Sequence, residues 1–189
     1  FKSNLSPYSK YKLMIEKYLK KIASKNFKVI ILRYPNIIGS SPNGKLGEKN
    51  FFITRIAPSF YKNLKKNKNN ILFYDFSKKS FPKRNYIHVE DIADINVRII
   101  QNLEKFKKDY NVFNINNQRQ YSNFDVLKSI AKIMKKNPKY SLKQIDKKES
   151  MSQFYKSKES LSKYINFKVK YKDLEKILKT NTKWFKKIY

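Results

Sequence analysis

Five segments of the chain place apolar side chains on one face with lysines between them, which predicts amphipathic helices. Leu13 and Leu19 mark that face in the first segment. In the second segment, Pro58 is expected to interrupt or bend the helix, because proline lacks the N–H that a helix interior uses. Ser122, with Asp125 three residues later, predicts the N-cap of the fourth. The helices are predicted at residues 8–24, 51–66, 91–106, 123–136 and 171–185.

Short apolar or alternating runs between these segments predict strands. Residues 27–32 form an apolar, β-branched run that is typical of a buried strand. A helix followed by such a strand is the pattern of a parallel α/β sheet. Residues 40–49 are expected to form a loop, since they contain Ser-Pro-Asn-Gly and Leu-Gly, and residues 141–160 are polar and weakly patterned. Further extended segments are predicted at 71–74, 86–89 and 110–115.

The composition excludes several classes of site. The chain has 189 residues, 40% of them hydrophobic, which suffices for a packed core in one domain or in parts of two. No apolar run approaches the roughly 20 residues of a membrane span, and no export signal is visible, so we expect a cytoplasmic protein without a membrane partner. The lack of cysteine excludes disulfides and thiolate metal ligands. The single histidine, His88, is expected to be structural, and no metal site is expected.

The formal net charge of +30 would ordinarily indicate a nucleic-acid or polyanion partner. Here 39 lysines stand against only 5 arginines, and asparagine, isoleucine, phenylalanine and tyrosine are abundant while glycine is scarce. Residues with AT-rich codons are therefore favoured throughout, and the lysines are spread along the chain. We expect no specific nucleic-acid partner, but a non-catalytic basic protein that binds polyanions remains an alternative of a different class.

Tyr8 and Lys12 form a Tyr-x-x-x-Lys pair near the start of the first predicted helix. This spacing places both side chains on one helix face, about one turn apart. A nearby ammonium favours the phenolate form of a tyrosine, which lets the tyrosine exchange protons near neutral pH. Spacing alone is weak evidence, because lysine is so common in this chain. The same spacing recurs at Tyr61/Lys65, Tyr74/Lys78 and Tyr164/Lys168.

The surroundings of Tyr8 and Lys12 set this pair apart. Four blocks of sequence, in order and at the right spacing, resemble the extended short-chain dehydrogenases/reductases of the NAD-dependent epimerase/dehydratase family. The loop Gly-x-x-Pro-Asn-Gly-x-x-Gly-Glu at 39–48 and the long stretch between Phe73 and Arg84 are most similar to UDP-glucose 4-epimerases. The resemblance is good over residues 5–136 and weak afterwards. The blocks are residues 6–16, 32–48, 84–94 and 110–122.

The resemblance implies roles for the residues on the cofactor side. Tyr8 would be the acid/base at the C4 hydroxyl of the sugar. Lys12 would hold the nicotinamide ribose and favour the Tyr8 phenolate. Tyr34 and Pro35 would lie beside the nicotinamide, where the family more often has an aromatic residue at the second position. The cofactor implied is NAD, regenerated in each cycle.

The resemblance also implies residues that bind the substrate, a UDP-hexose. Asn36 would hydrogen-bond near the diphosphate, and Arg84 would pair with it through a bidentate guanidinium. Phe73 would line the uracil pocket. Asn50 takes the place of a family Asn pair, although Phe51 replaces the second member. The alternative for Asn36 is a turn residue, and for Phe73 it is core packing.

Several parts of the family pattern are missing. Dinucleotide binding in this fold uses a Gly-rich turn between the first strand and helix, and these 189 residues contain no Gly-x-x-Gly-x-x-Gly. The serine or threonine that assists the tyrosine is absent, and Lys147 and Ser150 lie roughly where the family has Arg-x-Gly-Asp. We therefore expect the N-terminal dinucleotide-binding units to be absent, so that the chain is either a fragment of an epimerase or one chain of a split enzyme whose partner is an N-terminal NAD-binding chain.

The expectation from sequence is an α/β fold, the C-terminal part of a Rossmann-type parallel sheet with a small substrate-binding lobe. Residues 1–36 would end the Rossmann-type domain, and 37–189 would form the lobe, with a return to the sheet near 84–115. The resemblance implies UDP-glucose 4-epimerase chemistry through a 4-keto intermediate. We expect this chain to be inactive alone. The resemblance also implies a homodimer. Another nucleotide-sugar epimerase or dehydratase is the alternative within the same superfamily.

Overall fold

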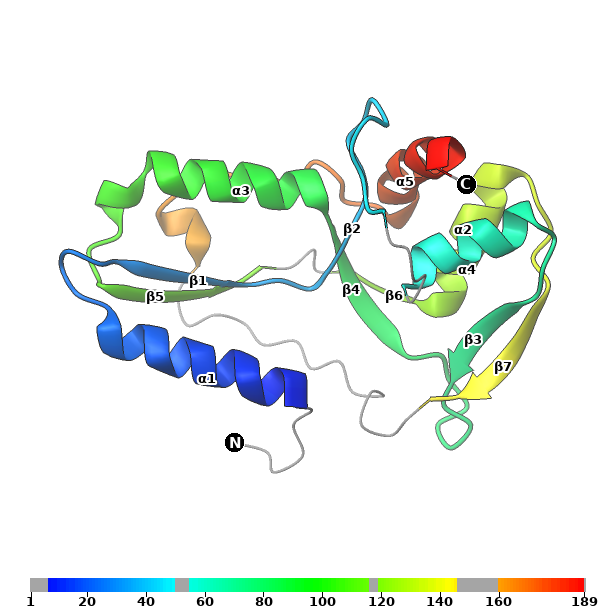
Figure 1. Ribbon diagram of the computed structural model, residues 1–189, viewed down its shortest axis with the longest axis horizontal. Helices are drawn as coiled ribbons and strands as arrows, with labels where there is room; N and C mark the ends of the chain where they lie inside the picture. The colour runs from blue at the N-terminus through cyan, green and yellow to red at the C-terminus, as the bar shows by residue number, and fades with distance from the viewer. Residues whose placement is uncertain (1–6, 50–54, 116–118, 146–159, 189) are drawn as a thin grey trace.

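The computed structural model describes residues 7–49, 55–115, 119–145 and 160–188. Its elements form two halves that lie side by side along the longest axis (Figure 1). The first, the sheet half, contains two strands between two helices, with short 3-10 helices nearby. Its elements are α1 (Pro7–Ile22), β1 (Val29–Arg33), α3 (Val89–Gln101), η1 (Leu103–Lys105), β5 (Tyr110–Asn114) and η2 (Leu161–Lys163).

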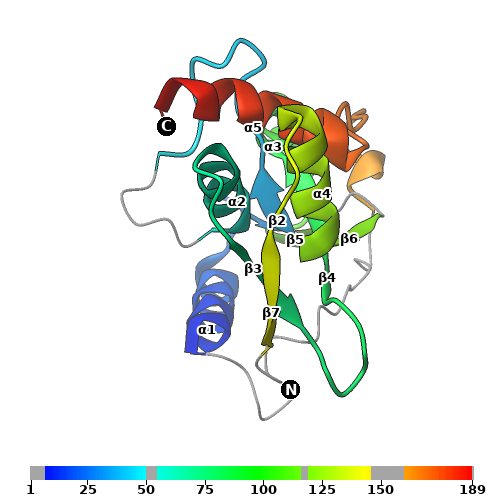
Figure 2. The same cartoon turned by 90° about the vertical axis from the view of Figure 1, so that its right-hand side faces the viewer.

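The second half, the helical half, packs three helices beside a pair of strands. Figure 2, a view onto this half, shows α2 and α4 alongside the strands and α5 across their upper ends. Its elements are α2 (Ile56–Lys65), β3 (Asn70–Tyr74), α4 (Asn123–Met134), β7 (Tyr140–Gln144) and α5 (Leu174–Ile188). Three further strands lie between the halves: β2 (Asn36–Ile38), β4 (Lys83–His88) and β6 (Gln120–Ser122).

The strand pairings are mostly parallel, as in an α/β protein. β1 pairs with β5 from Val29↔Tyr110 to Arg33↔Asn114, and β3 pairs with β7 in the same sense. β2 pairs in parallel with β4, which pairs antiparallel with β6 on its other side. Among the described residues β1 has β5 as its only strand neighbour, so its second edge is open.

Strand β4 separates two hydrophobic cores. Tyr86 packs into the core of the helical half, and the next residue, Ile87, packs into the core of the sheet half. This follows from the two-residue period of a strand, which points successive side chains to opposite faces. Phe185, Leu127 and Leu72 are central to the first core. The second core is built from Ile87, Ile95, Phe106, Phe113 and Ile165.

The chain crosses repeatedly between the two halves (Figure 1). It leaves the sheet half after β1, at residues 33–36, and returns where β4 leads directly into α3 at 88–89. It crosses again between η2 and α5, over residues 164–173. Each half is therefore assembled from segments that are distant in the sequence.

The capping box predicted for α4 is present. The Ser122 side chain accepts from the Asp125 N–H at 3.0 Å, and the Asp125 carboxylate accepts from the Ser122 N–H at 2.7 Å. The prediction for Pro58 was wrong. Arg55 has an extended backbone and α2 begins at Ile56, so Pro58 lies in the first turn, where a missing N–H costs no helical hydrogen bond.

Other boundaries differ from those predicted. α3 ends at Gln101, five residues before the predicted end, and the chain continues through η1 to the fully buried Phe106. α5 begins at Leu174 rather than at 171, and the N–H groups of Lys170 and Tyr171 before it donate to the Asp91 carboxylate. Strands β2, β6 and β7 were not predicted.

Candidate functional site

A cleft of about 1090 Å³ lies between the two halves. The C-terminal end of α1 lies away from it, whereas the first turns of α1, the β1–β2 corner, the start of α2 and strand β4 form its walls. Six residues that the sequence assigned to a site line this one cleft, although they come from three separate segments of the chain. They are Tyr8, Lys12, Tyr34, Pro35, Asn36 and Arg84.

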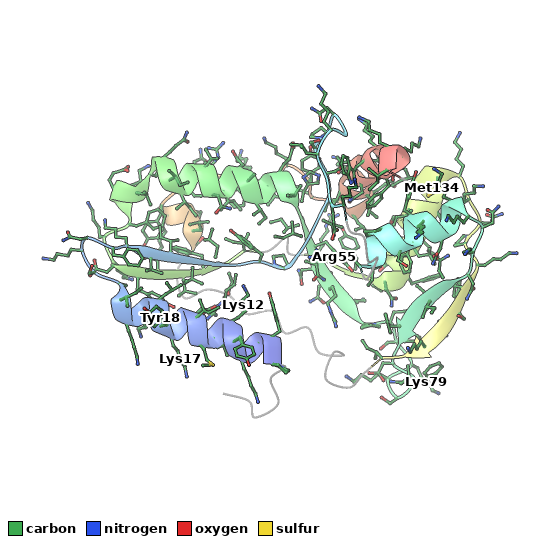
Figure 3. All side chains as sticks on the ribbon, viewed as in Figure 1. Lys12, Lys17, Tyr18, Arg55, Lys79 and Met134 are labelled. Carbon is green, nitrogen blue, oxygen red and sulfur yellow. The ribbon has the colours of Figure 1, made fainter. Side chains whose placement is uncertain are left out.

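Tyr8 and Lys12 lie at the exposed start of α1. The Lys12 ammonium is 5.7 Å from the centre of the Tyr8 ring, as one helical turn between them requires. The Tyr8 side chain is 72% exposed, so its hydroxyl is accessible to a ligand in the cleft. Figure 3 labels Lys12 on α1 and Arg55 at the start of α2, on opposite sides of the space between the halves.

An ion pair connects α1 to the end of β1. Arg33 contacts both carboxylate oxygens of Glu16, with Nε donating to Oε1 at 2.9 Å and Nη2 to Oε2. The hydrogen bond to Glu16 raises the pKa of the Arg33 guanidinium above its ordinary value. Glu16 lies one turn after Lys12 on the same helix face, so this pair fixes the rotation of the face that carries Tyr8 and Lys12.

The β1–β2 corner brings three predicted residues to the cleft. Tyr34 lies at the corner itself, and its hydroxyl oxygen accepts from Nδ2 of Asn96 on α3 at 3.1 Å. Pro35 follows, and Asn36 begins β2 opposite Tyr86 of β4. Because β2 is pinned to β4 by parallel pairing, the corner is held by hydrogen bonds on one side and by α3 on the other.

Arg84 reaches the cleft from β4, where it lies opposite Tyr121 of β6. One of its terminal nitrogens donates to the Lys83 carbonyl at 3.0 Å. Phe73 lies on β3 with its side chain 36% exposed, so it is not core packing, and it is not among the cleft-lining residues. Its carbonyl accepts from Asn123 at 2.8 Å. Asn50 lies outside the described residues.

The sequence reasoning missed a second arginine in the cleft. Arg55 and Glu48 both line it, with Arg55 Nε and Glu48 Oε1 2.9 Å apart. The scarcity of arginine was the signal that could have found it. Three of the chain's five arginines line the cleft.

His88 has a structural setting, as the sequence suggested. It is fully buried, its Nδ1 accepts from the Glu90 N–H at 3.1 Å, and its Nε2 lies 2.9 Å from the Thr180 hydroxyl. Its ring stacks on Tyr171 with centres 3.6 Å apart, and Gly39 lies so close that a Cβ there would be 2.3 Å from Cδ2. Burial lowers the pKa of His88 to about 4, so the imidazole is neutral near pH 7.

The remaining chemistry of the described chain is limited. Over residues 7–49, 55–115, 119–145 and 160–188 no cluster of acidic or histidine side chains could hold a metal ion. In the same ranges no helix is both long and apolar enough to cross a lipid bilayer. The cleft instead offers a hydroxyl beside an ammonium at one end and guanidinium groups elsewhere, which suits proton transfer on an anionic ligand.

The fit to a dinucleotide can be judged from the same residues. Tyr8, Lys12, Tyr34 and Pro35 could hold the nicotinamide and its ribose, because they bring a hydroxyl, an ammonium and an aromatic ring to the lining of the cleft. The described residues supply no glycine-rich turn for the pyrophosphate, since the glycines are Gly39, Gly44 and Gly47, packed against His88, Lys183 and Trp184. The cofactor-binding residues present thus fit only one end of such a group.

Comparisons with known proteins agree on the family. The chain is 26% identical over 183 residues to the UDP-glucose 4-epimerase of Lacticaseibacillus casei, covering 95% of this chain and 55% of the relative. It is 31% identical over 135 residues to the UDP-glucose 4-epimerase of Erwinia amylovora, and the match covers 67% of this chain and 39% of that relative. A crystal structure of UDP-glucose 4-epimerase from Bifidobacterium longum in complex with NAD+ and UDP superposes with a TM-score of 0.82 at 23% identity, covering 98% of this chain and 56% of that one.

These comparisons confirm the predicted α/β fold, matching part of a Rossmann-type epimerase. The chain spans about half the length of the curated relatives it matches. The model of the NAD dependent epimerase/dehydratase family matches residues 1–115, more than half of the chain. The chain therefore belongs to the NAD dependent epimerase/dehydratase family.

Proposed function

We propose that this chain is the catalytic and substrate-binding part of a UDP-glucose 4-epimerase that acts in the cytoplasm. The observation that carries the proposal is one cleft lined by Tyr8 and Lys12 from α1, Asn36 from β2 and Arg84 from β4. A proton-transferring pair and an anion-binding arginine thus face the same space, as inversion at one carbon of a nucleotide sugar needs.

The proposed chemistry begins with Tyr8. Its phenolate takes the proton of the sugar C4 hydroxyl while the C4–H bond breaks and the C4=O bond forms, giving a 4-keto sugar. NAD, when bound, would supply the hydride acceptor that this oxidation needs and the donor that restores the C4–H bond on the opposite face of the sugar. Tyr8 then gives its proton back to the C4 oxygen. Lys12 would hold the nicotinamide ribose.

The remaining residues position the substrate. Arg84 pairs with the diphosphate, for which a planar guanidinium is well matched. Asn36 offers a side-chain amide near the same group. Phe73 and Asn50 stay predicted contacts of the uridine. Since the sugar must turn within the site between the two hydrogen transfers, tight binding of the nucleotide end keeps the intermediate in place.

A partner for the sheet half follows from this proposal. β1 has an open edge among the described strands, and α1 has no buried residue. A dinucleotide-binding part, supplied from outside these 189 residues, would add a strand to that edge and cover α1. We expect the 189-residue chain alone not to retain NAD and to be inactive, and the family resemblance suggests a homodimer of the completed enzyme.

The first test is calorimetric titration of UDP-glucose into the purified 189-residue chain, without and with NAD+. Saturable binding is expected, because the residues proposed to hold the nucleotide come from this chain. A folded chain that binds single-stranded nucleic acid but no UDP-glucose would contradict the proposal and favour the polyanion-binding alternative.

The second test addresses the chemistry, in an enzyme completed with a dinucleotide-binding half. Tyr8→Phe removes only the hydroxyl and is expected to lower UDP-galactose turnover by about 10²- to 10⁴-fold, the usual contribution of a general acid/base. Tyr11→Phe is the matched control, since Tyr11 lies on the same helix, is 65% exposed and does not line the cleft. Unchanged turnover in Tyr8→Phe would exclude its proposed role.

A further inference from the structure

We propose that Arg55 is a second phosphate-binding side chain of the cleft, positioned for that task by Glu48. The inference rests on the proposed function, because it assumes a nucleoside diphosphate as ligand. Three arginines line the cleft, and Arg33 is engaged with both oxygens of Glu16. Arg84 already has a proposed role with the diphosphate. Arg55 is the arginine of the cleft for which no role has been given.

The backbone position of Arg55 gives it no evident structural purpose. It is the N-cap residue of α2, a position that favours Ser, Thr, Asp or Asn because their oxygens accept from the first N–H groups of the helix. A guanidinium has no acceptor, and Arg55 makes no side-chain cap. With its side chain 61% exposed, Arg55 also adds little to packing.

The contact with Glu48 suits a binding role. It uses Nε of the guanidinium, 2.9 Å from Oε1. A guanidinium carries five N–H donors in a planar fork, so a contact at Nε is compatible with a second, bidentate contact at the terminal nitrogens. An arginine held at one edge loses less side-chain entropy when it binds an anion, which raises the affinity.

Glu48 is itself held from α5. The Trp184 indole N–H donates to the Glu48 carbonyl at 2.8 Å. The indole also occupies the space beside Gly47, where a Cβ would lie 2.5 Å from Trp184 Cγ. Lys183, which precedes Trp184 on α5, donates to the carbonyl of Pro42, six residues before Glu48, at 3.1 Å. The loop that presents Glu48 is thus fixed to a helix of the helical half, so Glu48 is a rigid support for Arg55.

The charges of the cleft agree with a doubly charged ligand. Its lining includes four cationic side chains, Lys12, Arg33, Arg55 and Arg84, and two carboxylates, Glu16 and Glu48. Each carboxylate is paired with one arginine. Among the lining residues that the structure describes, positive charges therefore exceed negative charges by two, which matches a diphosphate rather than a neutral sugar.

The experiment compares UDP with uridine, a probe without phosphates. Both are titrated into the wild-type chain and into Arg55→Ala, Arg55→Lys, Arg84→Ala and Arg119→Ala at two salt concentrations. Arg119 is the matched control: it is 65% exposed, pairs with Asp173 at 2.6 Å and does not line the cleft. Thermal melting of each variant checks that the fold is retained.

We expect Arg55→Ala to weaken UDP binding on the order of tenfold, the usual effect of losing a charged hydrogen bond to an anion, and to leave uridine binding unchanged. Arg55→Lys should recover part of the loss, because a lysine keeps the charge but not the fork. The salt dependence of UDP binding should fall in Arg55→Ala and not in Arg119→Ala.

Three results would overturn the inference, and they can be told apart. If Arg84→Ala weakens UDP binding while Arg55→Ala does not, or if Arg55→Ala weakens UDP and uridine equally, the inference on Arg55 is wrong and the proposed function stands. If the folded wild-type chain binds no UDP, the proposed function and the inference fail together.

Discussion

Helices α1 and α5 are of similar length and composition but differ in what the chain packs against them. Both are lysine-rich and amphipathic, with 16 and 15 residues. α5 buries Leu174, Leu178 and Phe185 in the core that it shares with α2 and α4, whereas α1 buries no residue. An amphipathic pattern therefore shows that a helix needs a covering surface, and it does not show that its own chain supplies that surface.

The difference bears on where the proposed chemistry lies. Tyr11, Met14 and Tyr18 of α1 are all more than 60% exposed. The helix is held mainly by its half-buried face and by the Arg33–Glu16 pair. Tyr8 and Lys12 thus lie on a helix that buries no residue. Arg55 and Arg84 lie at the start of α2 and on β4, two elements that do contribute buried residues.

The largest effect is expected from matched aromatic truncations on the two helices. Phe185→Ala removes a fully buried ring that packs on Tyr61 with centres 5.2 Å apart, and should cost about 3–5 kcal/mol of unfolding free energy. Tyr18→Ala removes a ring that is 63% exposed and should change stability by less than about 0.5 kcal/mol. Urea denaturation measures both, and equal losses would mean that α1 is packed as firmly as α5.

Lowering the pH should reduce the difference between α5 and α1 in how firmly each helix is held. The folded pKa of His88 is about 4 against an ordinary 6.5, so between these values the unfolded chain binds more protons and stability rises with pH. Stability is therefore lost as pH falls from about 6.5 to about 4, by at most about 3 kcal/mol, at roughly 1.4 kcal/mol for each unit of pKa.

The measurement is urea denaturation at several pH values in that range. His88→Gln, which does not titrate there, serves as the control and should show a flatter profile. A wild-type profile as flat as that of the variant would show that His88 titrates normally in the folded chain. Because His88 lies beside Thr180 of α5 and Tyr171 just before it, acid should loosen the attachment of α5 first.

The smallest effect is local and concerns the ion pair on α1. Glu16→Gln leaves one hydrogen bond to Arg33 but removes the charge, so the amides of α1 should exchange with deuterium several times faster. Global stability should change by less than about 1 kcal/mol, since Arg33 is largely solvent-exposed.

The matched control lies on α5. Glu175→Gln weakens two comparable contacts, to Lys132 at 2.9 Å and Lys179 at 3.2 Å. Amide exchange in α5 should nevertheless stay unchanged, because its buried face holds the helix. Equal acceleration in both helices would show that surface pairs, and not burial, decide which helix is firm.

The parts of the fold that local patterns encode were predictable. The helices, β1 and the Ser122–Asp125 capping box follow from spacing within a few residues. Strand β7 was not predictable, because all its residues are exposed and the surrounding sequence is polar. Only its pairing with β3, some seventy residues earlier, makes it a strand. The prediction for Pro58 was wrong because the spacing of apolar residues does not show where the helix begins. The extended backbone of Arg55 sets that start.

The candidate site was predictable only where motifs carry it. Tyr8, Lys12, Asn36 and Arg84 stand in recognisable blocks, and the structure brings them to one cleft. Glu48 and Arg55 form an ion pair, and the Glu48 backbone is held by Trp184 from the far end of the chain. Such a contact has no signature in the sequence near either residue, so it could be recognised only from the structure.

The repeated crossings of the chain between the halves have a consequence for proteolysis and for opening of the cleft. A protease that cuts the connection at 33–36 would leave the halves still joined at 88–89 and along 164–173. A nicked chain should therefore migrate as one body under native conditions and come apart only in denaturant. Several connections in parallel also resist wide hinge opening, so a ligand would enter by rearrangement of side chains at the rim, such as Arg55, with the two halves remaining in place.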